Sequence, residues 1–274
     1  MGPEKKGAAP PEDALARIIF PKGVRVREVS SKSALTASKI PGMSYALNPY
    51  IGCSHACRYC YVRVMQRFFH HQGDVWGTFV DVKENAARLL MKELKRRKKG
   101  TVMLASATDC YQPLEKKLRL TRSCLELLSA ARFPVSVLTK SALVMRDIDV
   151  FRQIDELSVG LTITTDDEAV RRVMEPRASS IPDRLGALRA LHDAGLEPYV
   201  FVGPVLPMDA ERLAGLLEPL ASSVLFDRMN YPSLVRPLAM RHRWEMVLDL
   251  PWFEHVVSVF RRVFGDERVE AVCG

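Results

Sequence analysis

The sequence predicts an α/β protein with a largely parallel sheet, arranged either as a partial barrel or as a doubly wound sheet. From Tyr45 onward, short apolar and β-branched runs alternate with segments of helical periodicity. Six such units are visible, and this alternation implies right-handed parallel crossovers. The chain has 274 residues, 47% of them hydrophobic and 26% charged. That composition provides a sizeable core and excludes global disorder.

The first strand is expected at Tyr45 to Leu47, immediately before a cysteine-rich loop. Five more strands are predicted at 101–107, 134–139, 158–164, 198–203 and 222–226. Helices are predicted between them at 84–98, 120–131, 147–156, 182–194 and 210–220, with Gly100 and Gly195 as C-terminal caps. In folds of this kind, functional residues lie at the C-terminal ends of the strands.

The two ends of the chain differ in character from the repeating middle. Residues 1–18 are rich in Gly, Pro and mixed charge, which predicts a flexible leader before a barrel over 19–227. Residues 228–274 are irregular and rich in Arg, Trp and Phe, which predicts a C-terminal cap segment of the same domain. The chain contains neither an apolar run of about eighteen residues nor an apolar signal core, so we expect a cytoplasmic protein without a membrane partner.

The charge balance favours polyanionic partners. There are 40 Lys and Arg against 32 Asp and Glu, a net charge of +8. The basic run Lys95 to Lys99 precedes a strand, so it is expected on the face opposite the site. Arginines that follow the fourth and sixth strands are better placed for an anionic substrate: Arg171, Arg172, Arg177, Arg228, Arg236, Arg241 and Arg243.

Three of the six cysteines lie within eight residues, as Cys53, Cys57 and Cys60. This C-x3-C-x2-C spacing places three thiolates on a short loop, where they can hold three irons of a [4Fe–4S] cluster and leave the fourth iron open. The alternative is a structural zinc site completed by His55, His70 or His71, or a chance cluster. Structural zinc normally uses paired C-x2-C motifs, and Cys110, Cys124 and Cys273 form no such pair. No second cluster is expected.

The cysteine motif, with aromatic Tyr59 before its third cysteine, resembles the signature of the radical S-adenosylmethionine (radical SAM) superfamily. More narrowly, it resembles the spore photoproduct lyase-like (DNA repair photolyase-like) branch. The resemblance runs from about residue 25 to 210 and includes Asn48-Pro49-Tyr50-Ile51-Gly52-Cys53, Cys60-Tyr61, Thr108-Asp109-Cys110-Tyr111-Gln112-Pro113-Leu114-Glu115, Leu120-Thr121-Arg122, Thr139-Lys140-Ser141, Arg146-Asp147, Glu175-Pro176-Arg177, Arg184-Leu185 and Pro204-Val205-Leu206-Pro207.

This resemblance implies a partial (β/α)6 TIM-type barrel with an irregular C-terminal cap, containing a [4Fe–4S] cluster and S-adenosyl-L-methionine as cofactors. It also implies that the reduced cluster, supplied by an external one-electron donor of the flavodoxin or ferredoxin type, cleaves S-adenosylmethionine reductively. The resulting 5′-deoxyadenosyl radical abstracts hydrogen from a substrate carbon. The cofactor carries the difficult chemistry, and the protein orients it and excludes quenching groups.

Residue by residue, the resemblance makes Cys53, Cys57 and Cys60 the cluster ligands. Tyr59 would lie against the adenosyl group, and Lys140 would contact the cofactor carboxylate. Ser106, Thr108 and either Thr162 or Thr164 would belong to the same shell around the cofactor. Tyr61 matches a tyrosine that the lyases use in radical relay.

One departure from the lyases bears on the reaction. The lyases have Ala-Cys-Thr-Ser-Asp at the end of the second strand, and that cysteine returns hydrogen to the product. This chain has Ser106 at the cysteine position, and a serine O–H bond is too strong to donate hydrogen in this way. Cys110, four positions further on, is the candidate replacement, with packing in the core as the alternative. We therefore expect the radical chemistry on a substrate other than the thymine lesion of spores.

The leading interpretation is a radical SAM enzyme of the lyase-like branch that acts on DNA or RNA. The same chemistry on a peptide or small metabolite is a second interpretation, and a non-catalytic Fe–S or zinc binding module is a third. Glu175 and Arg177, with Arg184 at the start of the next helix, are expected to form a buried ion pair above the site. Trp76 and Phe79 are expected in the core.

Overall fold

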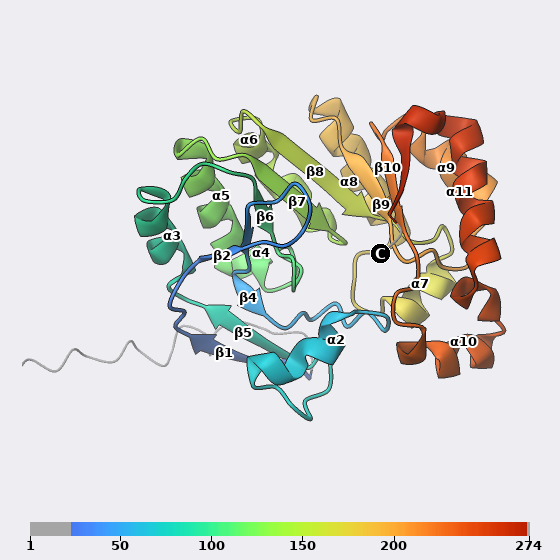
Figure 1. The fold of residues 1–274 in the computed structure, drawn as a ribbon, viewed down its shortest axis with the longest axis horizontal. Helices are drawn as coiled ribbons and strands as arrows, with labels where there is room; N and C mark the ends of the chain where they lie inside the picture. Colours follow the sequence, from blue (N-terminus) through green and yellow to red (C-terminus); the bar gives the residue numbers. More distant parts are fainter. Residues whose placement is uncertain (1–22, 273–274) are drawn as a thin grey trace, which may run out of the picture.

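The computed structural model describes residues 23–272, so the leader predicted for residues 1–18 lies outside the described part of the chain. Its main feature is a curved sheet of eight strands in the order β11-β10-β9-β8-β7-β6-β3-β2 (Figure 1). All neighbours pair in parallel except β2 with β3, which pair antiparallel. The strands of this sheet are β2 (Leu35–Ala37), β3 (Tyr45–Leu47), β6 (Val102–Leu104), β7 (Val135–Thr139), β8 (Leu157–Thr162), β9 (Tyr199–Val202), β10 (Val224–Asp227) and β11 (Val269–Val272).

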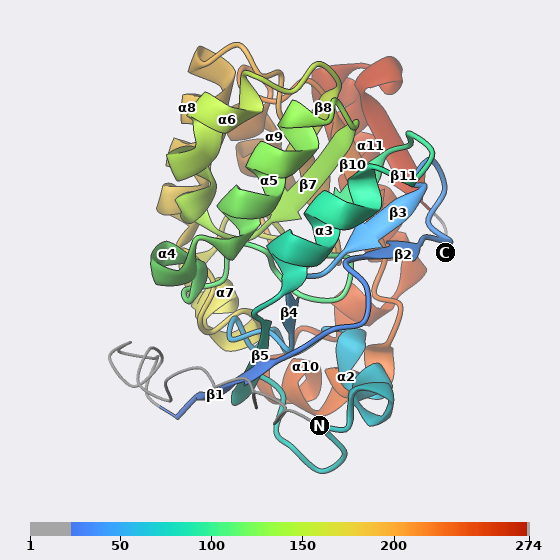
Figure 2. The ribbon, with the colours of Figure 1, turned by 90° about the vertical axis from the view of Figure 1, so that its left-hand side faces the viewer.

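Helices cover the outer side of this sheet, as the alternating pattern requires (Figure 2). They are α3 (Ala86–Leu94), α5 (Leu120–Ala130), α6 (Ile148–Phe151), α8 (Ile181–Asp193), α9 (Ala210–Leu217) and α11 (Leu250–Phe264). The main hydrophobic core lies between strands and helices and includes Leu104, Val137, Leu161 and Phe226, all of them buried. This arrangement confirms the partial (β/α)6 barrel, formed by β3 and β6 to β10 with their helices.

Local sequence accounts for several helix ends. The side chains of Ser180 and Asp209 accept hydrogen bonds from backbone N–H groups in the first turns of α8 and α9. Gly195 follows α8 with a φ of +77°, a left-handed conformation that favours glycine, as predicted. Gly100 does not cap α3, because that helix already ends at Leu94. The basic run Lys95 to Lys99 therefore forms an exposed turn before β6.

The segment after residue 227 is more regular than its sequence suggested. It contains α10 (Arg236–His242) and the 15-residue helix α11, and then β11, which pairs in parallel with β10. The sequence carries no strong strand signal at 269–272, because the run Val-Glu-Ala-Val has only four residues. Strand β11 extends the barrel sheet beyond the six predicted strands.

A second, three-stranded sheet was not predicted. It has the order β1-β5-β4, formed by β1 (Arg25–Val29), β5 (Phe79–Lys83) and β4 (Tyr50–Ile51). The described residues also contain the short helices α2 (Val62–Met65), α4 (Glu115–Leu118) and α7 (Glu168–Met174). In Figures 1 and 2 the small sheet, α2 and α10 lie below the barrel strands. The cysteine loop thus connects two strands of this small sheet, since β4 precedes it and β5 follows it.

His71 connects the small sheet to the loop in front of β5. It is buried, stacks on Phe79 at 3.8 Å between ring centroids, and contacts Asp74 through Nδ1 (2.6 Å) and Asp81 through Nε2 (3.0 Å). Arg27 from β1 donates two hydrogen bonds to Asp81, at 2.6 and 2.8 Å. His71 therefore has a packing role in this network.

We expect Asp81→Asn to lower stability at neutral pH and to lose this effect in acid. Burial raises the pKa of Asp81, but the hydrogen bonds from Arg27 and His71 outweigh burial and hold the pKa below its usual value. The unfolded chain therefore takes up the proton first, and the stabilisation present above about pH 4 is lost as the pH falls through the lowered native pKa. Urea unfolding of both proteins between pH 7 and pH 3 checks this. A difference between them that stays constant over this range would contradict it.

Among residues 23–272, no helix is long and apolar enough to cross a membrane.

Candidate active site

The cysteine loop follows β4 and leads into α2. Cys53 and Cys57 are buried and Cys60 is half-buried. Gly52 adopts a φ of +82°, and a Cβ there would lie 2.5 Å from the Phe79 carbonyl oxygen. Only glycine therefore permits this close approach of the loop to β5. The three thiols are consequently held on a short, tightly packed turn.

The three cysteines face a cavity of about 430 Å³ at the C-terminal ends of the barrel strands. Nine of the residues predicted for the site line it: Cys53, Cys57, Tyr59, Cys60, Tyr61, Ser106, Thr108, Lys140 and Thr162. They come from the cysteine loop and from the ends of β6, β7 and β8. Trp76, expected in the core, is buried but also lines the cavity.

The end of β6 anchors the cysteine loop. The Thr108 hydroxyl donates to the Gly52 carbonyl at 2.5 Å, and the Tyr61 hydroxyl donates to the Ser106 carbonyl. Asn48 donates to the Ser106 hydroxyl at 3.1 Å and accepts from the backbone N–H of Ala107 at 2.8 Å. Ser106 and Tyr61, which the sequence placed in different roles, are therefore in direct contact.

On the opposite side of the loop, Tyr59 is held by a buried ion pair. Its hydroxyl donates to Glu175, and Glu175 pairs with Arg184 at 2.5 Å. Both charged side chains have no solvent exposure. Burial raises the pKa of Glu175, but the charges of Arg184 and Lys140 outweigh it and hold the pKa below its usual value. Lys140 Nζ lies 5.6 Å from the centroid of the Tyr59 ring.

Thr164 does not line the cavity. It is fully buried, and its hydroxyl donates to Glu175 at 2.9 Å. Of the two threonines considered on β8 and just after it, Thr162 is the one that faces the cavity. The predicted ion pair above the site therefore exists between Glu175 and Arg184, with Thr164 behind it.

Arg177 is not part of that pair. Its backbone N–H donates to the His55 carbonyl at 3.2 Å and its guanidinium donates to the Gly77 carbonyl at 2.7 Å. The backbone N–H of Arg58 donates to the Met174 carbonyl at 2.8 Å. The segment 174–177 thus holds the cysteine loop from the side of β8 by backbone contacts.

Cys110 lies away from the cavity. It is fully buried within the main hydrophobic core, and its carbonyl accepts from the Thr121 hydroxyl at 2.7 Å. Its neighbour Asp109 does line the cavity, and the sequence did not single Asp109 out. Asp109 accepts from the Thr139 hydroxyl (2.7 Å) and the Lys140 backbone N–H (2.9 Å). The structure therefore places Cys110 in the packing role that was its alternative.

The seven arginines predicted for an anionic substrate lie in different environments. Arg171 is buried and pairs with Glu168 at 2.6 Å, so it does not contribute. Arg228 lines the cavity. Five others are exposed: Arg172, Arg177, Arg236, Arg241 and Arg243.

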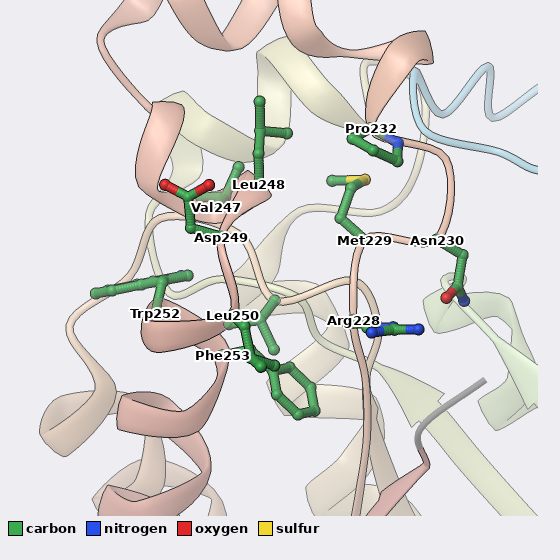
Figure 3. Close-up of a pocket in the computed structure, with 11 residues that line it drawn as sticks. Arg228, Met229, Asn230, Pro232, Val247, Leu248, Asp249, Leu250, Trp252 and Phe253 are labelled. Carbon is green, nitrogen blue, oxygen red and sulfur yellow. The ribbon is translucent and has the colours of Figure 1, made fainter.

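A second cavity of about 320 Å³ lies behind the loop that follows β10 (Figure 3). It shares Arg228, Met229 and Asn230 with the first cavity. In Figure 3, Arg228 and Asn230 extend away from Asp249 and Trp252, whereas Met229 points toward Leu248. The loop 228–232 is therefore the partition between the two cavities.

The donor set fits an iron–sulfur cluster with an open position. Three thiols are the ligands that such clusters take, and the three side chains border one cavity large enough for a cluster and part of a second molecule. Within residues 23–272, no three His, Cys, Asp or Glu side chains are grouped so as to hold a single metal ion. Of the histidines considered as zinc ligands, His71 is engaged by Asp74 and Asp81, and His70 is exposed. His55 is buried and lines the cavity, with its Nδ1 3.4 Å from Asp109 Oδ2.

The family model of the radical SAM superfamily matches residues 47–218, which include the three cysteines and the elements from β4 to α9. The chain belongs to the radical SAM superfamily. Its cofactors are accordingly a [4Fe–4S] cluster and S-adenosylmethionine.

Two curated proteins are similar to most of this chain. The chain is 35% identical over 209 residues to the uncharacterized protein MJ0683 of Methanocaldococcus jannaschii, which covers 76% of this chain and 78% of that protein. It is 34% identical over 215 residues to the uncharacterized protein Rv2578c of Mycobacterium tuberculosis, covering 73% of this chain. The matched part is 63% of the length of the mycobacterial protein.

Solved structures of spore photoproduct lyase share the radical SAM fold. One, a variant with bound AdoMet and dinucleoside spore photoproduct, matches with a TM-score of 0.63 and 17% identity over 90% of this chain and 81% of that chain. Another, complexed with dinucleoside spore photoproduct, matches with a TM-score of 0.63 and 18% identity, again over 90% of this chain and 81% of that chain.

Proposed function

We propose that this chain is a cytoplasmic radical SAM enzyme of the DNA-repair lyase-like type, which abstracts hydrogen from a nucleic-acid substrate. The observation that carries the proposal is the convergence of three thiols, two tyrosines and Lys140 on one cavity at the strand ends. Clefts of this kind at the ends of barrel strands are where such folds place their chemistry.

In this proposal Cys53, Cys57 and Cys60 hold the cluster. The bound cofactors supply one-electron reduction of the sulfonium and, at the adenosyl carbon, a hydrogen-atom acceptor. Tyr59, held by Glu175, presents its ring to the adenosyl group, and Lys140 binds the cofactor carboxylate. Ser106, Thr108 and Thr162 line the remaining wall. The external electron donor is of the flavodoxin or ferredoxin type.

Ser106 supports a substrate other than the spore lesion. Cys110 cannot reach the cavity from its core position without rearrangement, so no cysteine thiol besides the three ligands lines the cavity within the described residues. Tyr61, half-exposed at the cavity and in contact with Ser106, is the remaining side chain for radical relay. Repair of spore photoproduct with normal turnover would overturn this part of the proposal.

A nucleic-acid substrate is supported by charge and by position. The chain has a net charge of +8, and Arg236, Arg241 and Arg243 are exposed on or just after α10. The apolar side of α10 packs, through Leu238, in the same cluster as Tyr59, so this helix adjoins the site. The solved lyase structures contain a dinucleoside lesion, which is consistent with such a substrate.

We expect the double variant Arg241→Gln with Arg243→Gln to bind single-stranded DNA or RNA about ten- to a hundredfold more weakly at low salt. Two fewer phosphate contacts should also make the slope of log affinity against log salt about 1.4 units shallower. Fluorescence anisotropy at several salt concentrations measures both. The matched control is Lys98→Gln with Lys99→Gln, a pair of exposed cations before β6, at the opposite ends of the strands. An equal loss of affinity in the two double variants, or no loss in either, would count against Arg241 and Arg243 as phosphate-binding residues.

Each of the two alternative interpretations predicts a different experimental result. The same chemistry on a peptide or small metabolite predicts no salt-sensitive binding of nucleic acid. A non-catalytic Fe–S or zinc binding module predicts that the reconstituted, reduced protein forms no 5′-deoxyadenosine from S-adenosylmethionine. Formation of 5′-deoxyadenosine therefore tests whether the chain is an enzyme, and salt-sensitive binding tests whether its substrate is a nucleic acid.

A further inference from the structure

One carboxylate oxygen at the active cavity accepts no hydrogen bond from residues 23–272. Asp227 ends β10 and lines the cavity, where its Oδ2 accepts from Asn230 Nδ2 at 2.8 Å. Its Oδ1 is closed off from solvent and accepts no hydrogen bond from the described residues. Burial raises the pKa of Asp227, and the contacts with Asn230 and with the backbone N–H of Arg228 do not offset this. A buried acceptor left in this state costs free energy that a bound donor would recover.

Packing defines where this carboxylate lies. Asp227 and Phe201 flank Gly203, at which a Cβ would lie 2.3 Å from the Phe201 ring and 3.1 Å from the Cβ of Asp227. Glycine at this position therefore lets the two side chains close over the backbone. The carboxylate is thus positioned before any ligand arrives, which lowers the entropic cost of binding.

The wall around Asp227 differs from the wall around the cysteines. Cys53, Cys57, Cys60 and Lys140 lie on the cysteine loop and after β7, whereas Asp227 and Tyr231 lie at and after the end of β10. Lys140, whose charge acts on Cys57 and Cys60, also interacts with Glu175 but not with Asp227. The carboxylate therefore belongs to a part of the cavity wall that the cluster ligands and Lys140 do not form.

A carboxylate accepts hydrogen bonds from N–H or O–H groups, and its negative charge repels phosphate. Nucleobases carry N–H donors on a flat ring, and Tyr231, 40% exposed at the same wall, offers a surface on which a ring can stack. We propose that Asp227 recognises a nucleobase of the substrate by accepting a hydrogen bond from one of its N–H groups. This inference rests on the proposed nucleic-acid substrate. It adds that the protein contacts the bases of that substrate as well as its phosphates.

The test compares two probes, a mixed-sequence DNA ten-mer and a ten-mer of the same backbone without bases. We expect the base-dependent preference, the ratio of their dissociation constants, to fall about tenfold in Asp227→Ala, equivalent to about 1.4 kcal/mol. The salt dependence of both affinities should not change, because the phosphate contacts remain. Asp227→Asn keeps the shape of the side chain and should lower the ratio about threefold, so the test survives if the alanine variant misfolds.

Asp249→Ala is the matched control. Asp249 lies across the second cavity from Asn230, is exposed, and makes no side-chain capping bond to α11 (Figure 3). Its replacement should leave the ratio within twofold of wild type. An unchanged ratio in both Asp227 variants, or a wild-type protein that binds both probes equally, would overturn the proposal.

S-adenosylmethionine also carries N–H and O–H donors, so its affinity is measured in the same variants by equilibrium dialysis. A tenfold loss of S-adenosylmethionine affinity with an unchanged base-dependent ratio would assign Asp227 to the cofactor and overturn nucleobase recognition. If the wild-type protein forms 5′-deoxyadenosine but binds no ten-mer, base recognition fails while the radical SAM function stands. If it forms none and still shows the Asp227-dependent ratio, the proposed function fails and base recognition stands.

Discussion

Cys57→Ala is expected to abolish formation of 5′-deoxyadenosine. Three thiolates are the minimum that holds a [4Fe–4S] cluster with one open iron, and Cys57 lies between the other two on the loop, buried at the cavity. Loss of one ligand should reduce the bound iron well below four per chain and bring product to the background. The measurement is anaerobic reconstitution with iron and sulfide, followed by dithionite and S-adenosylmethionine, with chromatographic assay of 5′-deoxyadenosine.

Cys124→Ala is the matched control, since it removes a thiol that is equally buried but lies in the main core on α5. It should retain four irons per chain and wild-type product, with a modest loss of stability from the small cavity. Equal product in wild type and Cys57→Ala would contradict the assignment of this ligand. Four irons without product in the wild type would favour the binding module, and zinc in place of iron would show the loop to be a zinc site.

Glu175→Gln is expected to destabilise the protein by about 3 to 5 kcal/mol, because it leaves the fully buried Arg184 guanidinium without a counter-charge. It should also weaken S-adenosylmethionine binding, because Tyr59 loses the carboxylate that accepts from its hydroxyl. Urea unfolding measures the first effect, and equilibrium dialysis of the cofactor against the reconstituted protein measures the second. Tyr59→Phe should weaken S-adenosylmethionine binding with a much smaller loss of stability.

The control for this pair is Asp266→Asn, which breaks the exposed contact with Arg261 at 3.7 Å. Exposed ion pairs contribute little, so no measurable change in stability is expected. If Glu175→Gln were no more destabilising than Asp266→Asn, the buried pair would not be the element that holds Tyr59. If stability fell but cofactor affinity did not, the pair would support only the fold.

Much of the site could be predicted from the sequence because its metal-binding residues are close together in the chain. Cys53, Cys57 and Cys60 lie on one short loop, so their spacing alone indicates a shared metal centre. Lys140 and Thr108 follow predicted strands, Ser106 lies at the end of one, and parallel strands bring their C-terminal ends to one edge. Cys110 was misleading for the same reason. It follows Asp109, which faces the cavity, but the turn after β6 directs Cys110 into the core.

The sequence by itself determined the barrel strands β3 and β6 to β10 and the three thiols of the cysteine loop, since strand periodicity and ligand spacing are local properties of the chain. Only the tertiary structure decided that Glu175, 116 residues after Tyr59, would accept from its hydroxyl, and that Asp227 would face the same cavity. Such contacts depend on how the strands curve and on where the loop after β10 packs. No local pattern encodes them, because their partners meet only when the core has formed.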